Sequence, residues 1–288
     1  MKPAALTVAL VLACVLSSCD RFRSGPTPQA QGERIVCVSK QLTEMLFDLG
    51  AGGHIVGVDL SSTYPPEATK LPTVGYHRLL SAEGITSLHP TVVFHDGNVA
   101  PDAVLKQLTE VGIPIREFRA DNTIEGTKGL MKTLGDEFHV PSRADSLCRI
   151  LDEDLYSAQQ KRSQYTTIPR VLILHFGRVV NNYLVIGQRG TASLLLDWAG
   201  ARNAVDAPEG MKPLSAELVA ASRPDVILLT DFGYDRLGSV DAAKQLPGVA
   251  LTAAARNNKI YRIEEHDIVY FGPRTGKIVL DLMDLVHR

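Results

Sequence analysis

Cysteine is scarce in this chain, and so are aromatic side chains. Four of the 288 residues are cysteine, one is tryptophan, and aromatic residues make up 6% of the total. No CxxC pair and no Cys/His cluster occurs, so the sequence does not indicate a structural zinc site. Cys37 lies in an apolar strand-like run and Cys148 in a helical pattern. We expect both to be small buried residues rather than the halves of a disulfide.

The chain also lacks an excess of charge and the short motifs of common enzyme families. Its 30 Lys and Arg residues nearly balance 32 Asp and Glu residues, so the formal net charge of −2 gives no sign of a nucleic-acid partner. There is no GxSxG, P-loop or HExxH motif, and "GAGGH" at 50–54 follows a helix-like segment, unlike a dinucleotide-binding turn. The sequence therefore favours a binding protein over an enzyme.

A segment typical of secretion opens the chain. Lys2 precedes an apolar run over 4–16 that is too short to span a bilayer. The ending "LSSC" resembles the lipobox of bacterial lipoproteins, which implies removal of residues 1–18 and a lipid on Cys19. An ordinary signal peptide with an incidental cysteine is the alternative. Residues 19–33, rich in Pro, Gly, Ser and Gln, then predict a flexible tether to the outer face of a membrane.

Strands and helices alternate after the tether. Apolar runs typical of buried strands occupy 34–39, 54–59, 91–95, 113–118, 170–175, 183–187, 225–230 and 259–263. Helical patterns occupy 41–50, 100–111, 123–138, 191–199 and 276–286. This alternation predicts an α/β fold with mostly parallel sheets that are covered by helices on both faces.

One long helix is predicted between the two halves. Apolar residues recur at helical spacing at Leu147, Ile150, Leu151, Leu155 and Ala158. About six turns, at 1.5 Å per residue, give a helix of roughly 35 Å. We therefore expect an N-terminal lobe over 34–140, a rigid bridging helix over 141–167 and a C-terminal lobe over 168–288, with a ligand cleft between the lobes.

The two halves share repeated phrases. "LLSAEGITSLHPTVVFHDG" at 79–97 matches "LSAELVAASRPDVILLTDFG" at 214–233 in its Leu-Ser-Ala-Glu, its proline and its apolar β-branched run. "LFDLGAGGHIVGVD" at 46–59 similarly matches "LLDWAGARNAVD" at 195–206. The repeats predict two similar lobes, each with helix–turn–strand followed by helix–strand.

The chain resembles the substrate-binding lipoproteins of bacterial ABC importers. Four segments carry the resemblance, in this order: "RIVCVSKQLTEMLFDLG", "LPTVGYHRLLSAEGITSLHP", "KPLSAELVAASRPDVILL" and "FGPRTG". The resemblance covers nearly all of 33–288 and is closest to the helix-bridged type that binds heme, cobalamin or siderophores, and within it to the heme-binding members. It implies capture of heme (hemin) for iron acquisition, without catalysis or a catalytic cofactor, and delivery to a permease dimer with its ATPase subunits. Cobalamin or a ferric siderophore is the alternative cargo.

The resemblance implies that Tyr64, in "SSTYPPEA", ligates ferric heme iron. Tyr64 follows a predicted strand at the carboxyl end, where open α/β sheets present ligands. A phenolate is a hard anion that suits Fe(III), and tyrosine is a known axial ligand. Ionising an ordinary tyrosine at pH 7 costs about 4 kcal/mol, which iron and a nearby cation reduce. Arg78 is the candidate for that cation; an amphipathic turn residue is the alternative reading of Tyr64.

The other expected heme contacts come from both halves of the chain. His175, at the end of a predicted strand, and His77, beside Arg78, are candidates for a second iron ligand. Guanidinium and ammonium groups suit the two propionates. The candidates for this role, in addition to Arg78, are Arg178, Arg189, Lys212 and Arg274. Tyr270 and Phe271 are expected to pack on a porphyrin face.

Glu83 and Glu217 occupy matching positions in the repeated phrase. In the family that the chain resembles, each lobe tip presents a surface glutamate to permease arginines, so these two residues are the candidates for docking. A structural alternative exists, because Ser81 and Ser215 are predicted N-caps. A glutamate two residues later would favour the helix dipole by about 0.3–1 kcal/mol whatever its partner.

Overall fold

The computed structural model describes residues 32–177, 180–206 and 210–288. Its first half contains a parallel sheet of four strands in the order β2-β1-β3-β4. Its strands are β1 (Ile35–Cys37), β2 (Ile55–Val58), β3 (Val92–His95) and β4 (Ile115–Glu117). The accompanying helices are α2 (Lys40–Asp48), α3 (Ala82–Thr86), α4 (Asp102–Glu110) and α5 (Ile124–Glu137), with the 3₁₀ turns η1 (Gly52–His54) and η2 (Ala68–Lys70). Each strand predicted from the first half is therefore confirmed.

The second half contains a mixed sheet. Its order is β10-β9-β5-β6-β8, and β7 pairs with β5 as well. The strands are β5 (Arg170–Gly177), β6 (Asn182–Ile186), β7 (Arg202–Asn203), β8 (Met211–Pro213), β9 (Val226–Thr230) and β10 (Ile260–Ile263). β6 runs antiparallel to β5 and to β8, a departure from a purely parallel sheet. The separation along the chain explains it, because only residues 178–181 lie between β5 and β6, whereas a parallel crossover needs a dozen or more.

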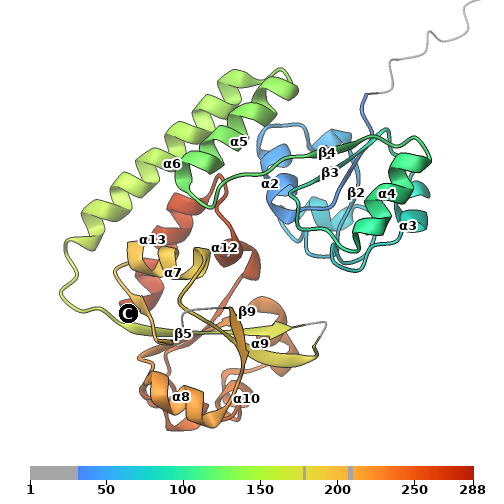
Figure 1. Ribbon diagram of the computed structural model, residues 1–288. Coiled ribbons are helices and arrows are strands. Elements are labelled where there is room, and N and C mark those ends of the chain that lie inside the picture. Colours follow the sequence, from blue (N-terminus) through green and yellow to red (C-terminus); the bar gives the residue numbers. More distant parts are fainter. Residues whose placement is uncertain (1–31, 178–179, 207–209) are drawn as a thin grey trace, which may run out of the picture. The chain divides into compact units, whose positions relative to one another are not determined.

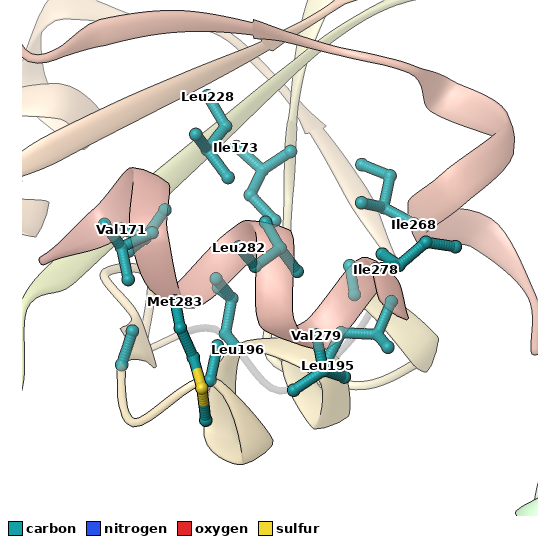
Figure 2. Close-up of a cluster of buried hydrophobic side chains, with 14 of the residues drawn as sticks. Val171, Ile173, Leu195, Leu196, Leu228, Ile268, Ile278, Val279, Leu282 and Met283 are labelled. Atoms are coloured by element: carbon teal, nitrogen blue, oxygen red, sulfur yellow. The ribbon is translucent and has the colours of Figure 1, made fainter. Parts of the chain in front are cut away.

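Helices cover this second sheet. They are α7 (Thr191–Trp198), α8 (Ala216–Ser222), α9 (Asp231–Leu237), α10 (Val240–Lys244), α11 (Ala253–Arg256), α12 (Glu265–Val269) and α13 (Thr275–Val286), with the 3₁₀ turn η3 (Val249–Leu251). Figure 2 shows the hydrophobic core to which α13 contributes its apolar side chains. Ile278, Val279, Leu282 and Met283 meet residues of β5, β9 and α7 there. The apolar face of α13 thus holds it to the sheet.

The long helix α6 (Pro141–Arg162) has 22 residues and packs against α5 and α13 (Figure 1). It starts with Pro141 in the first turn, where a missing N–H does no harm. It ends at Arg162, before the predicted limit of 167. Lys161 and Arg162 in the last turn complement the negative end of the helix dipole. A bridging helix is therefore present between the two sheets along the chain.

Residues 34–288 form one compact unit. Cys37 and Cys148 are free and buried within it, as expected. The predicted signal peptide, Cys19 and all but the last two residues of the predicted tether lie outside the described residues. In the part of the chain that the structure describes, no helix is long and apolar enough to cross a membrane.

Close packing of α13 on α6 generates a stability prediction at Gly276. A Cβ atom there would lie 2.5 Å from Cβ of Asp154 and 2.9 Å from the backbone nitrogen of Leu155. We expect Gly276→Ala to lower the free energy of unfolding by about 1–3 kcal/mol, because the two helix backbones must separate. Urea unfolding of the variant and of the unmodified chain measures this difference.

Gly129, inside α5, is the matched control for that substitution. A Cβ atom at Gly129 would meet nothing within 4 Å. Gly129→Ala should therefore raise the free energy of unfolding by about 0.5–1 kcal/mol through helix propensity alone. Equal effects of the two substitutions would contradict the close approach of α13 to α6.

Candidate functional site

A cavity of about 610 Å³ lies where the parallel strands of both sheets end. Its wall includes residues that directly follow the carboxyl ends of β1, β3 and β9, namely Val38, Asp96 and Asp231. Residues after β10 and at the end of β5 complete it from the second sheet. Ligand cavities of drug-sized molecules are typically 300–1,000 Å³, and open α/β sheets bind ligands at this edge. The cavity is therefore the candidate site.

The segment 76–79 contributes four consecutive residues to the cavity wall. Tyr76 is half-buried, and its ring centroid lies 4.3 Å from that of His77. Arg78 is exposed and donates from Nη2 to Oδ1 of Asn98 at 2.9 Å. His77 and Arg78 were predicted to contact heme, but Tyr76, which stands between the glycine and the histidine of "VGYHR", was overlooked. A phenol next to an arginine on the cavity wall is the signal that could have identified it.

The imidazole of His77 contacts the buried carboxylate of Asp59. Its Nδ1 lies 3.0 Å from Oδ2 of Asp59, whose side chain is 0% exposed. Asp59 also accepts from the hydroxyl of Ser62 at 2.6 Å and from the backbone N–H of Ser61 at 3.0 Å. Burial works to raise the pKa of Asp59, but the hydrogen bonds from His77, Ser61 and Ser62 outweigh it and hold the pKa below its usual value. Asp59 is thus a fixed anion behind the cavity wall.

Tyr64 meets a different cation from the one expected. It is not among the residues of the cavity wall, and the guanidinium carbon of Arg274 sits 3.6 Å from its ring centroid. The ring of His266 lies 5.4 Å away on centroid distance. Burial raises the pKa of Tyr64 even though Arg274 opposes the rise. The expected pairing of Arg78 with Tyr64 is therefore corrected: Arg274 is the cation at Tyr64, and Arg78 bonds to Asn98.

A buried charge network forms the back of the cavity. Glu44 of α2 has a side chain that is 2% exposed, and its carboxylate meets residues of α12 and of the start of α13. Nε2 of His266 lies 2.8 Å from Oε2, the hydroxyl of Tyr270 donates to Oε2 at 3.1 Å, and Nε of Arg274 donates to Oε1 at 2.7 Å. Burial acts to raise the pKa of Glu44, but His266 and Arg274 outweigh it and lower the pKa. The network joins the two halves of the chain.

Several residues that were predicted to contact heme either belong to this network or lie away from the cavity. Arg274 binds Glu44 and, through Nη2, Asp267 at 2.8 Å. Tyr270 reaches the cavity wall, but burial first and then Glu44 raise the pKa of its phenol well above 10.0. The expectation for Phe271 is wrong, because its side chain is 1% exposed and packs on Trp198 in the core. An aromatic ring in the core cannot also cover a porphyrin.

The remaining candidates divide by position. His175 lines the cavity from β5, with Nδ1 3.4 Å from the hydroxyl of Thr230. Arg189 and Lys212 are exposed and are not among the residues of the cavity wall. Arg178 lies outside the described residues. The structure therefore brings His77, Arg78 and His175 to one cavity with Tyr76, and Arg189, Lys212 and Arg274 are not among the residues of its wall.

Comparison with known proteins gives the relationship of the chain. A family model described as periplasmic binding protein matches residues 35–266. The chain belongs to the periplasmic binding protein family. The solved structure of the periplasmic heme-binding protein RhuT from Roseiflexus sp. RS-1, in apo form, is 35% identical to it. The aligned region covers 88% of this chain and 98% of the RhuT chain, with a TM-score of 0.81.

Two curated relatives of this periplasmic binding protein have other descriptions. The ABC transporter substrate-binding lipoprotein YvrC of Bacillus subtilis is 23% identical over 270 residues, which are 93% of this chain and 84% of its own. The vitamin B12-binding protein of Photorhabdus laumondii is 26% identical over 198 residues, which are 68% of this chain and 70% of its own. The expected α/β fold is confirmed, and the protein is a substrate-binding protein of the heme, cobalamin and siderophore group.

The repeated phrase of the periplasmic binding protein gives two equivalent surface glutamates. Glu83 in α3 and Glu217 in α8 are both exposed in the first turn of their helices. The predicted N-caps are confirmed, because Ser81 accepts from the N–H of Gly84 at 3.1 Å and Ser215 from that of Leu218 at 3.2 Å. Each helix then leads to a buried strand, β3 or β9. The carboxylate of Glu217 takes part in its cap as well, since hydrogen bonds from its own backbone N–H and from Ser215 lower its pKa.

The Glu44 network generates a prediction about stability and pH. Glu44→Gln should lower the free energy of unfolding at pH 7 by about 3–5 kcal/mol, because it breaks a buried ion pair while His266 stays buried and Arg274 half-buried. The pKa of Glu44 is lower in the folded chain than its ordinary 4.5. Its stabilisation is then fully present above that ordinary value and is lost as the pH falls through the folded value. Denaturant unfolding at pH 7 and below pH 4 measures both effects.

Glu110→Gln, at an exposed glutamate of α4, is the control for the buried one. Its ion pair with Lys106 spans 3.9 Å on the surface, so the change should cost under about 1 kcal/mol at either pH. A Glu44→Gln variant as stable as this control at pH 7 would contradict the role of the network.

Proposed function

We propose that this periplasmic binding protein captures heme in the cavity and delivers it to an ABC permease for iron acquisition. The observation that carries the proposal is the segment 76–78, which presents a phenol, an imidazole and a guanidinium on one cavity wall. A tyrosine phenolate is a hard donor for ferric iron and a known axial heme ligand. A guanidinium close to it lowers the free energy of ionising the phenol. The proposed role is binding without chemistry.

The rest of the cavity wall fits a flat amphiphilic cargo. Leu184, Met211 and Val269 of the second half give apolar surface for a porphyrin face. His175, from the same half, is the candidate for an axial ligand from the opposite side. Arg78 hydrogen-bonds a neutral amide, so its charge can serve a propionate or the Tyr76 phenolate. Tyr76 therefore replaces Tyr64 as the proposed iron ligand.

Cobalamin is the second candidate cargo. It is favoured by relatives described as vitamin B12-binding proteins, at 26% identity for that of Photorhabdus laumondii. The solved heme-binding relative at 35% identity and a tyrosine, Tyr76, on the cavity wall support heme. A ferric siderophore already saturates its iron, so a ligating tyrosine gives it no advantage.

Hemin titration of residues 32–288 tests the proposed ligand. We expect saturable binding with a high-spin ferric tyrosinate spectrum, followed by the Soret and charge-transfer bands. Tyr76→Phe should remove that spectrum and weaken hemin binding at least about 100-fold, because loss of a direct ligand exceeds the 10- to 100-fold effect of an outer-shell change. Cobalamin is titrated in parallel.

Tyr64→Phe is the matched control, since it removes a phenol from the neighbouring loop that is not part of the cavity wall. It should leave the spectrum unchanged. A tyrosinate spectrum lost in Tyr64→Phe and kept in Tyr76→Phe would restore Tyr64 as the ligand. Saturable binding of cobalamin but not of hemin would overturn the proposal of heme.

We further propose that the protein acts on the extracytoplasmic face of the membrane, anchored by a lipid on Cys19. The relationship to a substrate-binding lipoprotein supports this location. Glu83 and Glu217 would then dock on arginines of the two permease subunits. Their support is geometric: both are exposed, both follow a capping serine, and both belong to the repeated phrase.

Charge reversal tests the docking proposal. In the bacterium of origin, the double variant Glu83→Lys/Glu217→Lys should slow hemin-dependent uptake at least about tenfold, because like charges in an interface cost several kcal/mol. Hemin affinity of the purified variant should not change. Glu110→Lys, at another exposed glutamate, is the control. Unaltered uptake by the double variant would contradict docking through these two residues.

A further inference from the structure

The cavity wall carries charges of both signs. Apart from its histidines, the cations among the described residues of the wall are Lys40 and Arg78, and the carboxylates are Asp96, Asp231 and Glu265. Ammonium and guanidinium groups both suit a carboxylate of a cargo, and binding at one or the other would orient that cargo differently. The partners that each cation already has therefore decide where a carboxylate can bind.

Lys40 belongs to an ion pair that joins the two halves of the chain. Its Nζ donates to Oε1 of Glu265, the first residue of α12, at 3.0 Å. The two side chains are 15% and 25% exposed, so the pair is largely shielded from water. Breaking a shielded pair leaves one charge uncompensated, which is strongly destabilising. A cargo carboxylate that took Lys40 would displace Glu265 and leave it in that state.

A second carboxylate lies at the same end of the cavity. Oδ1 of Asp231 accepts from the backbone N–H of Glu265 at 3.1 Å. A backbone N–H carries no net charge, so this bond does not compensate the charge of Asp231. A carboxylate of the cargo would meet both anions here, and juxtaposed like charges weaken binding.

The surroundings of Arg78 are different. Its side chain is exposed, and its Nη2 donates to Oδ1 of Asn98 at 2.9 Å. That acceptor is a neutral amide, and a guanidinium has five N–H donors in all. A carboxylate can therefore bind Arg78 in a bidentate manner without displacing another anion.

We propose that Glu265 determines the orientation of the cargo, because it neutralises Lys40 and leaves Arg78 as the carboxylate subsite of the cavity. The inference rests on the proposed function and deepens it, since it concerns how an anionic porphyrin is directed. Glu265 acts through Lys40 and needs no contact of its own with the cargo. It excludes the alternative orientation by repulsion, which is one of the two physical routes to specificity.

The first turn of α2 is held by contacts other than this pair. Nε2 of Gln41 donates to the carbonyl of Phe271 at 2.7 Å, and Glu44 bonds to His266 and Arg274. Glu265→Gln removes the negative charge but keeps an amide oxygen that can accept from Lys40. The substitution therefore changes the charge at this end of the cavity more than the packing.

Comparison of hemin with its dimethyl ester, in which both carboxylates are capped, tests the assignment. Protein of residues 32–288 is titrated with each compound, and the Kd of the ester divided by that of hemin measures the preference for carboxylates. Effects on the iron cancel in this ratio, because the two compounds contain the same iron porphyrin. Glu265→Gln should raise the ratio at least about tenfold, as expected for a new hydrogen bond between charged groups. Arg78→Gln in the otherwise unmodified chain should abolish the preference.

Two further variants show whether Lys40 is the subsite that Glu265→Gln creates. Adding Lys40→Gln to Glu265→Gln should return the ratio to that of the unmodified chain. Glu264→Gln is the matched control, because Glu264 is the preceding residue, pairs with Arg262 and is not among the residues of the cavity wall. It removes the same charge and should leave the ratio unchanged.

The outcomes separate the inference from the function it deepens. If hemin does not bind the unmodified chain, the proposed function fails and the inference with it. If hemin binds but the ratio is the same in Glu265→Gln as in the unmodified chain, the inference alone is overturned. Should Glu265→Gln fail to fold, Arg78→Gln decides. Loss of the preference for carboxylates supports the inference, and a preference that persists overturns it.

Discussion

The ion pairs of Glu44 are the interaction on which the rest of the structure depends. This carboxylate belongs to α2 of the first half, yet its partners His266, Tyr270 and Arg274 all belong to the second. A buried anion deprived of its cations is strongly destabilising, so α2 cannot separate from α12 and α13 without a large loss of free energy. Lys40 and Gln41 of the same helix add contacts to Glu265 and to the carbonyl of Phe271. The back of the cavity is therefore held together, and cargo capture has to proceed with small movements of its walls.

Topology explains why a cavity forms in front of this network. Parallel strands place all their carboxyl ends at one edge, and the loops that follow them carry the polar residues. Ser39 follows β1, Asp59 and Ser61 follow β2, and Asp96 and Asn98 follow β3. His175 lies in the last part of β5. These residues are distant in sequence but converge because each follows a buried apolar strand whose position is fixed by the core. The repeated phrase adds a second consequence, because each half also begins a capped helix with an exposed glutamate in its first turn.

The fold was largely predictable from the sequence, and the site only in part. Apolar runs such as "RIVCVS" and "RVLILH" are unambiguous strand signals, and the Ser-Ala-Glu phrases predicted both N-caps. The antiparallel β6 needed attention to the short connection after β5. Tyr64 was predicted as the iron ligand and Tyr76 was overlooked, because the sequence does not show which of the two loops lines the cavity. Their difference comes from Arg274, which is 210 positions away from Tyr64 in the chain yet covers its ring. Glu44 was missed for the same reason: its partners are all distant in sequence.

Charge pairing around the cavity determines which half orients the cargo. Arg274 is bound to Glu44 and Asp267, and Lys40 to Glu265, so these cations are already neutralised by carboxylates. Arg78 instead bonds to the neutral amide of Asn98. Among the described residues of the cavity wall, Arg78 bonds to this amide rather than to a carboxylate, and it lies in the same three-residue segment of the first half as Tyr76 and His77. The second half contributes His175 and apolar surface. Apolar contacts are non-directional, so they restrict the orientation of the cargo less. An amphiphilic, anionic metalloporphyrin would therefore be oriented by the first half of the chain and covered by the second.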